Sequence, residues 1–270
     1  MRSTNCAPPR TRIHPIDAIQ SSPFVDEDHA VLDLYFAPTP NGWKITIMLE
    51  ECGLEYSVKP INLGKGDQFK PEFLKISPNN RMPAIVDHDA PGKQISIFES
   101  GAILVYLAEK TGRFMPRELH ARFDVLQWLF WQVGGLGPMA GQLSHFVNYA
   151  PGGPSQHDYS HTRYANEYDR LFAVMERSLC EHEYLAGDYS IADMTSWPWV
   201  VPYKRFEQSM DAYPNVRRWF DAIKSRPAVR RGMDVGKDLR RPAGEMTEEQ
   251  RKTMFGQTGA SVLRGQRTDV

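Results

Sequence analysis

The chain has 270 residues, of which 41% are hydrophobic and 24% are charged, which is the composition of an ordinary globular protein of one or two domains. Its formal net charge of -1 offers no excess of positive charge for nucleic acid or an anionic lipid surface. The sequence has no apolar run of membrane-spanning or signal-peptide length. We therefore expect a cytoplasmic protein with no nucleic-acid or membrane partner.

The first elements of the chain predict an extension followed by a strand and a helix. Residues 1–29 are rich in proline, serine and charge without a sustained period, and we interpret them as an N-terminal extension. Residues 31–36 are apolar and aromatic, as in a short strand, and 37–42 are turn formers. The helix that follows has one apolar face, formed by Ile45, Met48, Leu49 and Cys52. Gly53 is suited to end it.

Three further strands and a helix follow. Residues 56–62 predict a second strand, which Pro60 places at an edge of the sheet because proline cannot donate a backbone hydrogen bond. Residues 84–87 and 94–98 predict an antiparallel hairpin, and 99–112 predict a helix. The order is a βαβ unit, which favours a parallel strand pair, followed by a ββα unit.

The element pattern divides the chain into four parts. Residues 30–113 form a predicted α/β domain, and 117–234 form an all-helical domain with repeated apolar spacing at helical period. Within the latter, Ser190 and Asp193 predict a capping box at a helix start. Residues 235–270 are polar and charged, and we interpret them as a C-terminal tail.

Cysteine and histidine patterns limit the chemistry. The cysteines are Cys6, Cys52 and Cys180, and no C-x-x-C pair is present, so thiol chemistry would need a bound thiol. No H-E-x-x-H motif occurs, and we expect no metal site.

The first candidate binding feature is the Met82-Pro83 pair just before a predicted strand. A cis bond there would leave the backbone N–H and C=O of Met82 open to an extended peptide, as in strand addition to a sheet edge. The alternative is an ordinary trans proline between a loop and a strand, which is the commoner case.

The second candidate is Glu99-Ser100 at a predicted helix start. The free N–H groups and partial positive charge of a helix start favour a ligand carboxylate beside Ser100, while Glu99 can meet a ligand ammonium. Together they match the end of an α-amino acid. The alternative is a plain helix cap.

The third candidate is the turn that carries Thr39 and Asn41. Its hydroxyl, its amide and the N–H groups of the following helix form a donor cluster, which can stabilise a thiolate. The same residue types are also expected in any turn.

Four motifs together resemble the glutathione transferases, and most closely their bacterial Nu class. They are FAPTPNG at 36–42, ISPNNRMPA at 76–84, FESGAIL at 98–104 and WLFWQVGGLGP at 128–138. The resemblance covers residues 31–234 and implies the glutathione transferase fold, a thioredoxin-like N-terminal domain followed by an all-α domain, in a homodimer.

The resemblance also implies roles for residues. Pro83 should be cis, with Met82 pairing with the cysteinyl backbone of glutathione and with Glu99 and Ser100 holding its γ-glutamyl end. Thr39 and Asn41 stand where other classes use Tyr, Ser or Cys beside the sulfur, and we take them as the catalytic residues. Further contacts to glutathione are implied for three positions, Gln68, Arg81 and Arg163.

By the same resemblance we expect a glutathione-dependent disulfide-bond reductase that holds two glutathione molecules, or one glutathione disulfide, in each site. Reduction of organic hydroperoxides is a further implied activity. Two alternatives remain, namely a transferase that conjugates glutathione to electrophiles, and a non-enzymatic scaffold or regulator on the same fold.

Overall fold

The computed structural model describes residues 31–240 and 246–264, and these divide into two compact units. Residues 31–103 and the described residues from Arg231 onward form one unit, here called the α/β unit. Residues Leu104–Arg230 form the other, here called the helical unit. The chain thus combines an α/β fold with a helical fold, as predicted, while the domain boundaries at 113 and 234 stay predictions.

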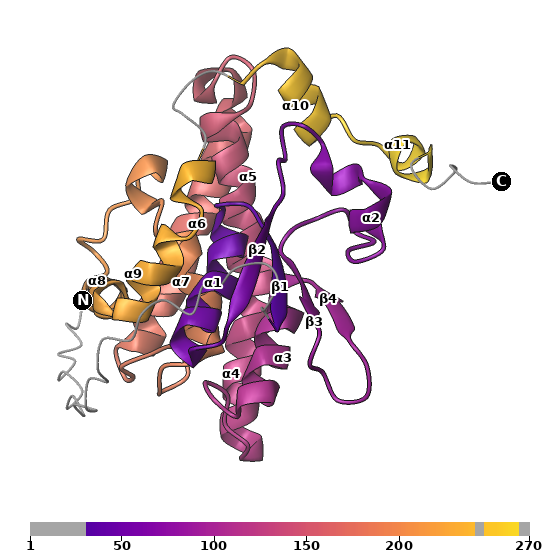
Figure 1. The fold of residues 1–270 in the computed structure, drawn as a ribbon. Helices are drawn as coiled ribbons and strands as arrows, with labels where there is room; N and C mark the ends of the chain where they lie inside the picture. Colours follow the sequence, from indigo (N-terminus) through magenta and orange to yellow (C-terminus); the bar gives the residue numbers. More distant parts are fainter. Residues whose placement is uncertain (1–30, 241–245, 265–270) are drawn as a thin grey trace. The chain divides into compact units, whose positions relative to one another are not determined.

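The α/β unit is built on a four-stranded sheet in the order β2-β1-β3-β4 (Figure 1). Its strands are β1 (Leu32–Phe36), β2 (Tyr56–Pro60), β3 (Ala84–Asp87) and β4 (Ile95–Phe98). β1 and β2 are parallel, whereas β3 is antiparallel to both β1 and β4. The predicted parallel pair, hairpin and edge position of Pro60 are therefore confirmed. A four-stranded sheet with one parallel and two antiparallel strand pairs in this order is typical of a thioredoxin-like domain.

The helix α1 (Pro40–Cys52) follows β1 and begins at a side-chain cap. The Thr39 hydroxyl accepts a hydrogen bond from the Gly42 N–H at 3.3 Å, which satisfies one unpaired donor of the first turn. At the other end Gly53 has a φ of 68°, a left-handed conformation that glycine adopts without strain. Further along the chain are α2 (Pro71–Leu74), in the same unit, and α3 (Ser100–Thr111), whose first four residues belong to it.

Residues after Arg231 pack against α1 within the α/β unit. The Thr46 hydroxyl donates to the Gly232 carbonyl at 2.8 Å, and a Cβ at position 232 would lie 2.8 Å from the backbone nitrogen of Ile47. The Arg231 Nε lies 2.7 Å from a carboxylate oxygen of Glu50, whose side chain is fully buried. Backbone contact and an ion pair to a buried carboxylate therefore hold the end of α9 (Pro227–Asp234) on α1.

The predicted C-terminal tail contains helices. They are α10 (Glu248–Phe255) and α11 (Gly259–Arg264), shown in yellow in Figure 1. Thr247 and Gln250 form a capping box at the start of α10, in which each side chain bonds the backbone N–H of the other residue. The sequence did not predict these helices, because the polar composition of residues 235–270 was interpreted as that of a tail. The Asn80 side chain donates to the Gln257 Oε1 at 3.3 Å, so the segment contacts the loop before Met82.

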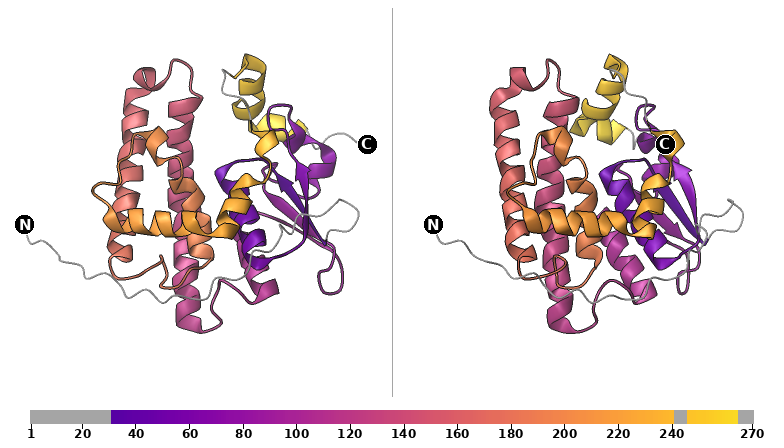
Figure 2. Two further views of the ribbon diagram at one scale, coloured as in Figure 1. Left: turned by 60° about the vertical axis from the view of Figure 1, so that its left-hand side comes forward. Right: turned by 90° about the vertical axis from the view of Figure 1, so that its left-hand side faces the viewer.

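The helical unit contains two long parallel columns of helix (Figure 2). α4, a π-helical turn at 132–136 and α5 form one column, and α6 lies beside α5. The helices are α4 (Leu119–Trp131), α5 (Gly137–Asn148), α6 (Asp158–Leu179), α7 (Ile191–Val200) and α8 (Pro214–Ser225). Across residues 31–240 and 246–264, no helix combines the length and the apolar character needed to cross a membrane.

The predicted capping box at the start of α7 is confirmed. The carboxylate of Asp193 is fully buried and accepts hydrogen bonds from the Ser190 N–H, the Leu185 N–H and the Trp219 indole N–H at 2.8–3.0 Å. Burial raises the pKa of Asp193 to about 6, and these donors oppose that rise. Asp193 thereby links α7 to α8 in the core of the helical unit.

Candidate functional site

The peptide bond between Met82 and Pro83 is cis, as the resemblance predicts. No other residue in 31–240 or 246–264 forms a hydrogen bond with the backbone N–H or C=O of Met82. The Met82 side chain is half-buried and packs against the apolar cluster of Ile61, Phe73 and Ala84. The residue is therefore anchored by its side chain while its backbone polar groups are left for a partner in extended conformation.

Thr39 lies beside Met82 at the start of α1. Its hydroxyl donates to the Met82 sulfur at 3.6 Å and accepts from Gly42, so its single proton is already engaged. Asn41 is the second residue of α1, half-buried, and its backbone belongs to the first turn, where N–H groups lack helical partners. The structure thus brings the predicted thiolate-stabilising turn next to the predicted peptide-binding residue.

Glu99 and Ser100 form the junction between β4 and α3. Glu99 has a φ of 69°, a left-handed conformation that a non-glycine residue adopts at an energetic cost of order 1 kcal/mol. Its carboxylate accepts from the Asn79 amide at 3.2 Å. Ser100 is the first residue of α3 and is buried, with 8% of the residue exposed. A helix start and a carboxylate therefore lie together, as the sequence predicts.

Sequence reasoning missed Lys44, which lies on α1 against this junction. Its Nζ donates to the Ser100 hydroxyl oxygen at 3.2 Å, and the residue is only 2% exposed. Burial lowers the pKa of Lys44 to about 7, and the negative charge of Glu99 opposes this shift. Lys44 precedes Met48 by four residues and so adjoins the apolar face of its helix, but this spacing alone does not predict that a lysine is buried.

Gln68 and Arg81 lie in the same unit. Gln68 is buried, its Nε2 donates to the Leu63 carbonyl at 3.3 Å, and its buried Oε1 has no hydrogen-bond partner within the described part of the chain. Arg81 is exposed, and its carbonyl accepts from the Ser77 hydroxyl at 2.8 Å. Gln68 therefore offers an unused acceptor, while Arg81 is an exposed residue.

Arg163 belongs to the helical unit. It lies on α6, is exposed, and its guanidinium is 3.7 Å from the Glu167 carboxylate. The other predicted site residues belong to the α/β unit. A role for Arg163 in the same site stays a prediction.

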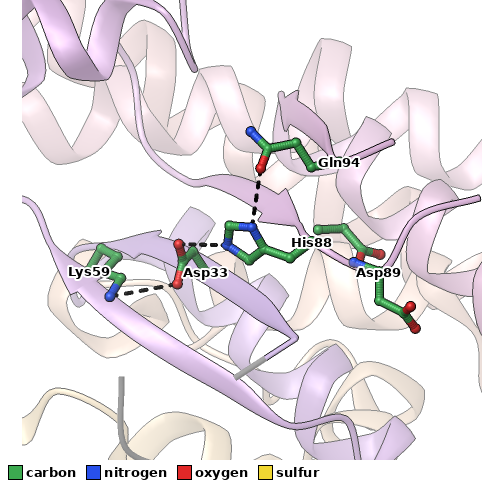
Figure 3. Close-up of polar contacts among 6 residues, drawn as sticks. Asp33, Lys59, His88, Asp89 and Gln94 are labelled. Carbon is green, nitrogen blue, oxygen red and sulfur yellow. Dashed lines mark hydrogen bonds and ion pairs between the residues drawn. The ribbon is translucent and has the colours of Figure 1, made fainter. Parts of the chain in front are cut away.

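A separate polar cluster lies at the sheet surface (Figure 3). Asp33 of β1 contacts the His88 Nε2 at 3.0 Å and the Lys59 Nζ at 3.7 Å, and the His88 Nδ1 lies 3.3 Å from the Gln94 Oε1. The cluster ties β1 and β2 to the turn between β3 and β4. In the described ranges, no three His, Cys, Asp or Glu side chains are grouped as metal ligands.

Fold and site together define a glutathione S-transferase, and the chain belongs to that family. The model of the glutathione S-transferase N-terminal domain matches residues 30–109, and that of the C-terminal domain matches residues 152–227. The two matches fall on the thioredoxin-like sheet and on the helices from α6 to α8.

Two curated relatives carry more specific names. The disulfide-bond oxidoreductase YfcG of Escherichia coli (strain K12) is 53% identical over 202 residues, which cover 74% of this chain and 93% of YfcG. The disulfide-bond oxidoreductase YghU of the same organism is 42% identical over 220 residues, covering 76% of this chain and 75% of YghU.

Solved structures of similar proteins contain glutathione. A glutathione transferase from Burkholderia graminis, with two glutathione molecules bound per subunit, matches with a TM-score of 0.71 and 44% identity, covering 76% of this chain and 88% of that one. A glutathione transferase from Pseudomonas putida, with one glutathione disulfide per subunit, matches with a TM-score of 0.73 and 40% identity, covering 78% and 94%.

Proposed function

We propose that this protein is a glutathione-dependent disulfide-bond oxidoreductase of the Nu class. The observation that carries the proposal is the pairing of an open Met82 backbone with a donor-rich turn that contains no cysteine. Cys52 is eleven residues beyond Asn41 in α1, about 16 Å along the helix axis. The reactive sulfur would therefore belong to the bound tripeptide. The names of YfcG and YghU support the same reaction class.

Glutathione would bind along the α/β unit as an extended peptide. Its cysteinyl backbone pairs with Met82, which places the thiol near Thr39 and Asn41. The α-carboxylate of its γ-glutamyl group meets Ser100 and the start of α3, and its ammonium meets Glu99. Gln68 offers an acceptor to a ligand N–H. Arg81 and Arg163 carry the positive charges that the resemblance assigns to the site.

The reaction consists of two thiol–disulfide exchanges. A glutathione thiolate attacks one sulfur of the substrate disulfide, forms a mixed disulfide and expels the other sulfur as a thiolate. A second glutathione thiolate attacks the glutathione sulfur of that mixed disulfide, forms glutathione disulfide and releases the second substrate thiolate. Two glutathione molecules are oxidised and one disulfide is reduced. Two glutathiones or one glutathione disulfide per subunit in similar structures fit this scheme.

Parallel assays test this function. Glutathione-dependent reduction of a small disulfide is measured beside conjugation of a halogenated aromatic and reduction of an organic hydroperoxide. We expect disulfide reduction to dominate, and a variant with Cys52, the free cysteine of the described residues, replaced by serine to keep its rate within about twofold. A dominant conjugation rate rejects the reductase, and loss of activity in the folded Cys52→Ser variant rejects a mechanism based on the bound thiol alone.

We also propose a homodimer that works in the cytoplasm, where glutathione is kept reduced. The supporting observation is an exposed apolar stripe on α4 and the π-helical turn after it, at helical spacing. The stripe comprises Leu119, Phe123, Phe130 and Val133. Phe130→Asp should convert the dimer to a monomer in light scattering, whereas the exposed Tyr159→Asp should not. A wild-type monomer at micromolar concentration would contradict the dimer.

A further inference from the structure

A buried lysine lies against the residues proposed to hold the γ-glutamyl end of glutathione. Lys44 is 2% exposed, and Ser100, whose hydroxyl oxygen is 3.2 Å from the Lys44 Nζ, is 8% exposed. The two residues come from α1 and from the first position of α3. A charged group beneath a helix start is unusual, because burying an ammonium is unfavourable unless its surroundings compensate.

The hydrogen bond to Lys44 determines where the Ser100 proton can point. Below its pKa of about 7 Lys44 is an ammonium that only donates, so in that protonation state the Ser100 oxygen must accept from it. The single hydroxyl proton of Ser100 is then directed away from Lys44 toward another acceptor. An α-carboxylate at the start of α3 would be that acceptor. The Ser100 hydroxyl would then lie between this carboxylate and the Lys44 ammonium.

The negative charge of Glu99 interacts favourably with the Lys44 ammonium. Its carboxylate opposes the lowering of the Lys44 pKa and also holds the Asn79 amide. A glutathione ammonium bound to Glu99 would weaken the favourable interaction between Glu99 and the Lys44 ammonium. The ligand carboxylate would then take over as the negative partner of the lysine. Binding of both ends of an α-amino acid therefore keeps the local charge balanced.

We propose that Lys44 is a positioning residue for the glutathione α-carboxylate, acting through the Ser100 hydroxyl rather than by direct contact. The inference rests on the proposed function, because it needs glutathione in this site. It makes Lys44 a determinant of specificity for ligands with a free α-carboxylate on the γ-glutamyl group. Lys44 would have little influence on the thiol, which lies toward Thr39 and Asn41.

The test compares two ligands by calorimetry. One is S-methylglutathione, which lacks a titrating thiol, and the other is its analogue with γ-aminobutyrate in place of the γ-glutamyl group, which lacks the α-carboxylate. Lys44→Met should weaken the first about 10- to 100-fold and change the second less than about threefold, since a hydrogen bond to a charged group is lost in one case only. Equal weakening of both ligands, or of neither, overturns the proposal.

Two further variants separate positioning from folding. In a Ser100→Ala background, Lys44→Met should add less than about threefold to the loss, because the two residues act as one unit. Additive losses contradict action through Ser100. Lys44→Gln keeps a hydrogen-bond donor on a side chain one bond shorter, and it replaces Lys44→Met in the same ligand comparison, with the same expected contrast, if Lys44→Met strongly lowers the thermal midpoint. In steady-state assays Lys44→Met should raise the KM for glutathione and leave kcat within about twofold, whereas a general structural defect lowers kcat as well.

The outcome is distinguishable from a failure of the proposed function. If the wild-type protein binds neither S-methylglutathione nor glutathione disulfide, the proposed function itself is rejected. If wild type binds them and the Lys44 variants bind equally well, only the role of Lys44 is rejected.

Discussion

The Thr39 hydroxyl donates a hydrogen bond to the Met82 sulfur at 3.6 Å and joins the start of α1 to the residue before the cis proline. The two residues are 43 positions apart in the chain, and each was singled out by a different sequence argument. Their contact places a donor-rich helix start beside an unpaired stretch of backbone. A cysteinyl residue bound at Met82 would thus have its sulfur near α1.

The Asn41 side-chain amide carries two donor hydrogens, whereas the Thr39 hydroxyl has one, which it donates to Met82, so we test Asn41 as a residue that stabilises the thiolate. Asn41→Ala should lower kcat/KM for disulfide reduction roughly 10- to 100-fold, as expected for loss of one donor to a developing or resident anion. The matched control is Asn166→Ala on an exposed position of α6, which should leave the rate unchanged. Full activity of Asn41→Ala removes this residue from the mechanism.

The contact between α9 and α1 predicts a strong effect of a single methyl group. Gly232→Ala would bring a Cβ to 2.8 Å from the Ile47 nitrogen and should lower the free energy of unfolding by about 2 kcal/mol or more. In Gly134→Ala the new Cβ meets no atom within 4 Å, and the variant should be neutral or gain up to about 1 kcal/mol. Urea denaturation of both variants checks this contrast. Similar stabilities would show that the α1–α9 contact does not form as described.

The ion pair between Arg231 and Glu50 predicts a second effect on stability. The Glu50 side chain is fully buried and also accepts from the Tyr56 hydroxyl at 3.0 Å, while Arg231 is partly exposed. Arg231→Leu would leave the carboxylate without this cation and should cost about 2 kcal/mol. The exposed Arg177→Ala should cost about 0.5 kcal/mol or less. If Arg231→Leu and Arg177→Ala lose equal amounts of stability in thermal and urea unfolding, the ion pair contributes no more to stability than an exposed arginine does.

Lys44 predicts how stability changes with pH. Its pKa falls from 10.5 to about 7 on folding, so the unfolded chain binds more protons between these values and the wild type gains stability as pH rises through this window. In the Lys44→Met variant no ionisable group occupies this position. The unfolding free energy of wild type minus that of the variant should therefore rise by about 2 kcal/mol from pH 6.5 to pH 9. A difference that is constant with pH would show that Lys44 stays protonated throughout.

The sheet and its helices could be predicted from the sequence, because the local residue patterns indicate the same elements that the packed structure contains. Pro60 indicated an edge strand, and Ser190 with Asp193 marked a helix start, since each has a direct consequence for backbone hydrogen bonding. The predicted ligand-binding residues were recognised from their motifs, and the structure places all of them except Arg163 in one unit.

Other features could not be predicted because they depend on long-range contacts. A lysine on a helix is exposed by default, so the burial of Lys44 against Ser100 depends on α3, which lies more than fifty residues later. Residues 231–234 were predicted to end the helical domain, yet the Gly232 carbonyl and Arg231 attach them to α1. The π-helical turn after α4 was not predicted either; it contains Gly134, where an added Cβ would meet no atom within 4 Å.

The most direct test of the central claim is a crystal structure of the protein soaked with glutathione disulfide. We predict one tripeptide with its cysteinyl N–H and C=O paired to the Met82 backbone, its γ-glutamyl carboxylate at Ser100 and its sulfur near Asn41. The absence of ligand beside Met82 at saturating concentration, or a ligand bound elsewhere on the chain, would contradict the claim.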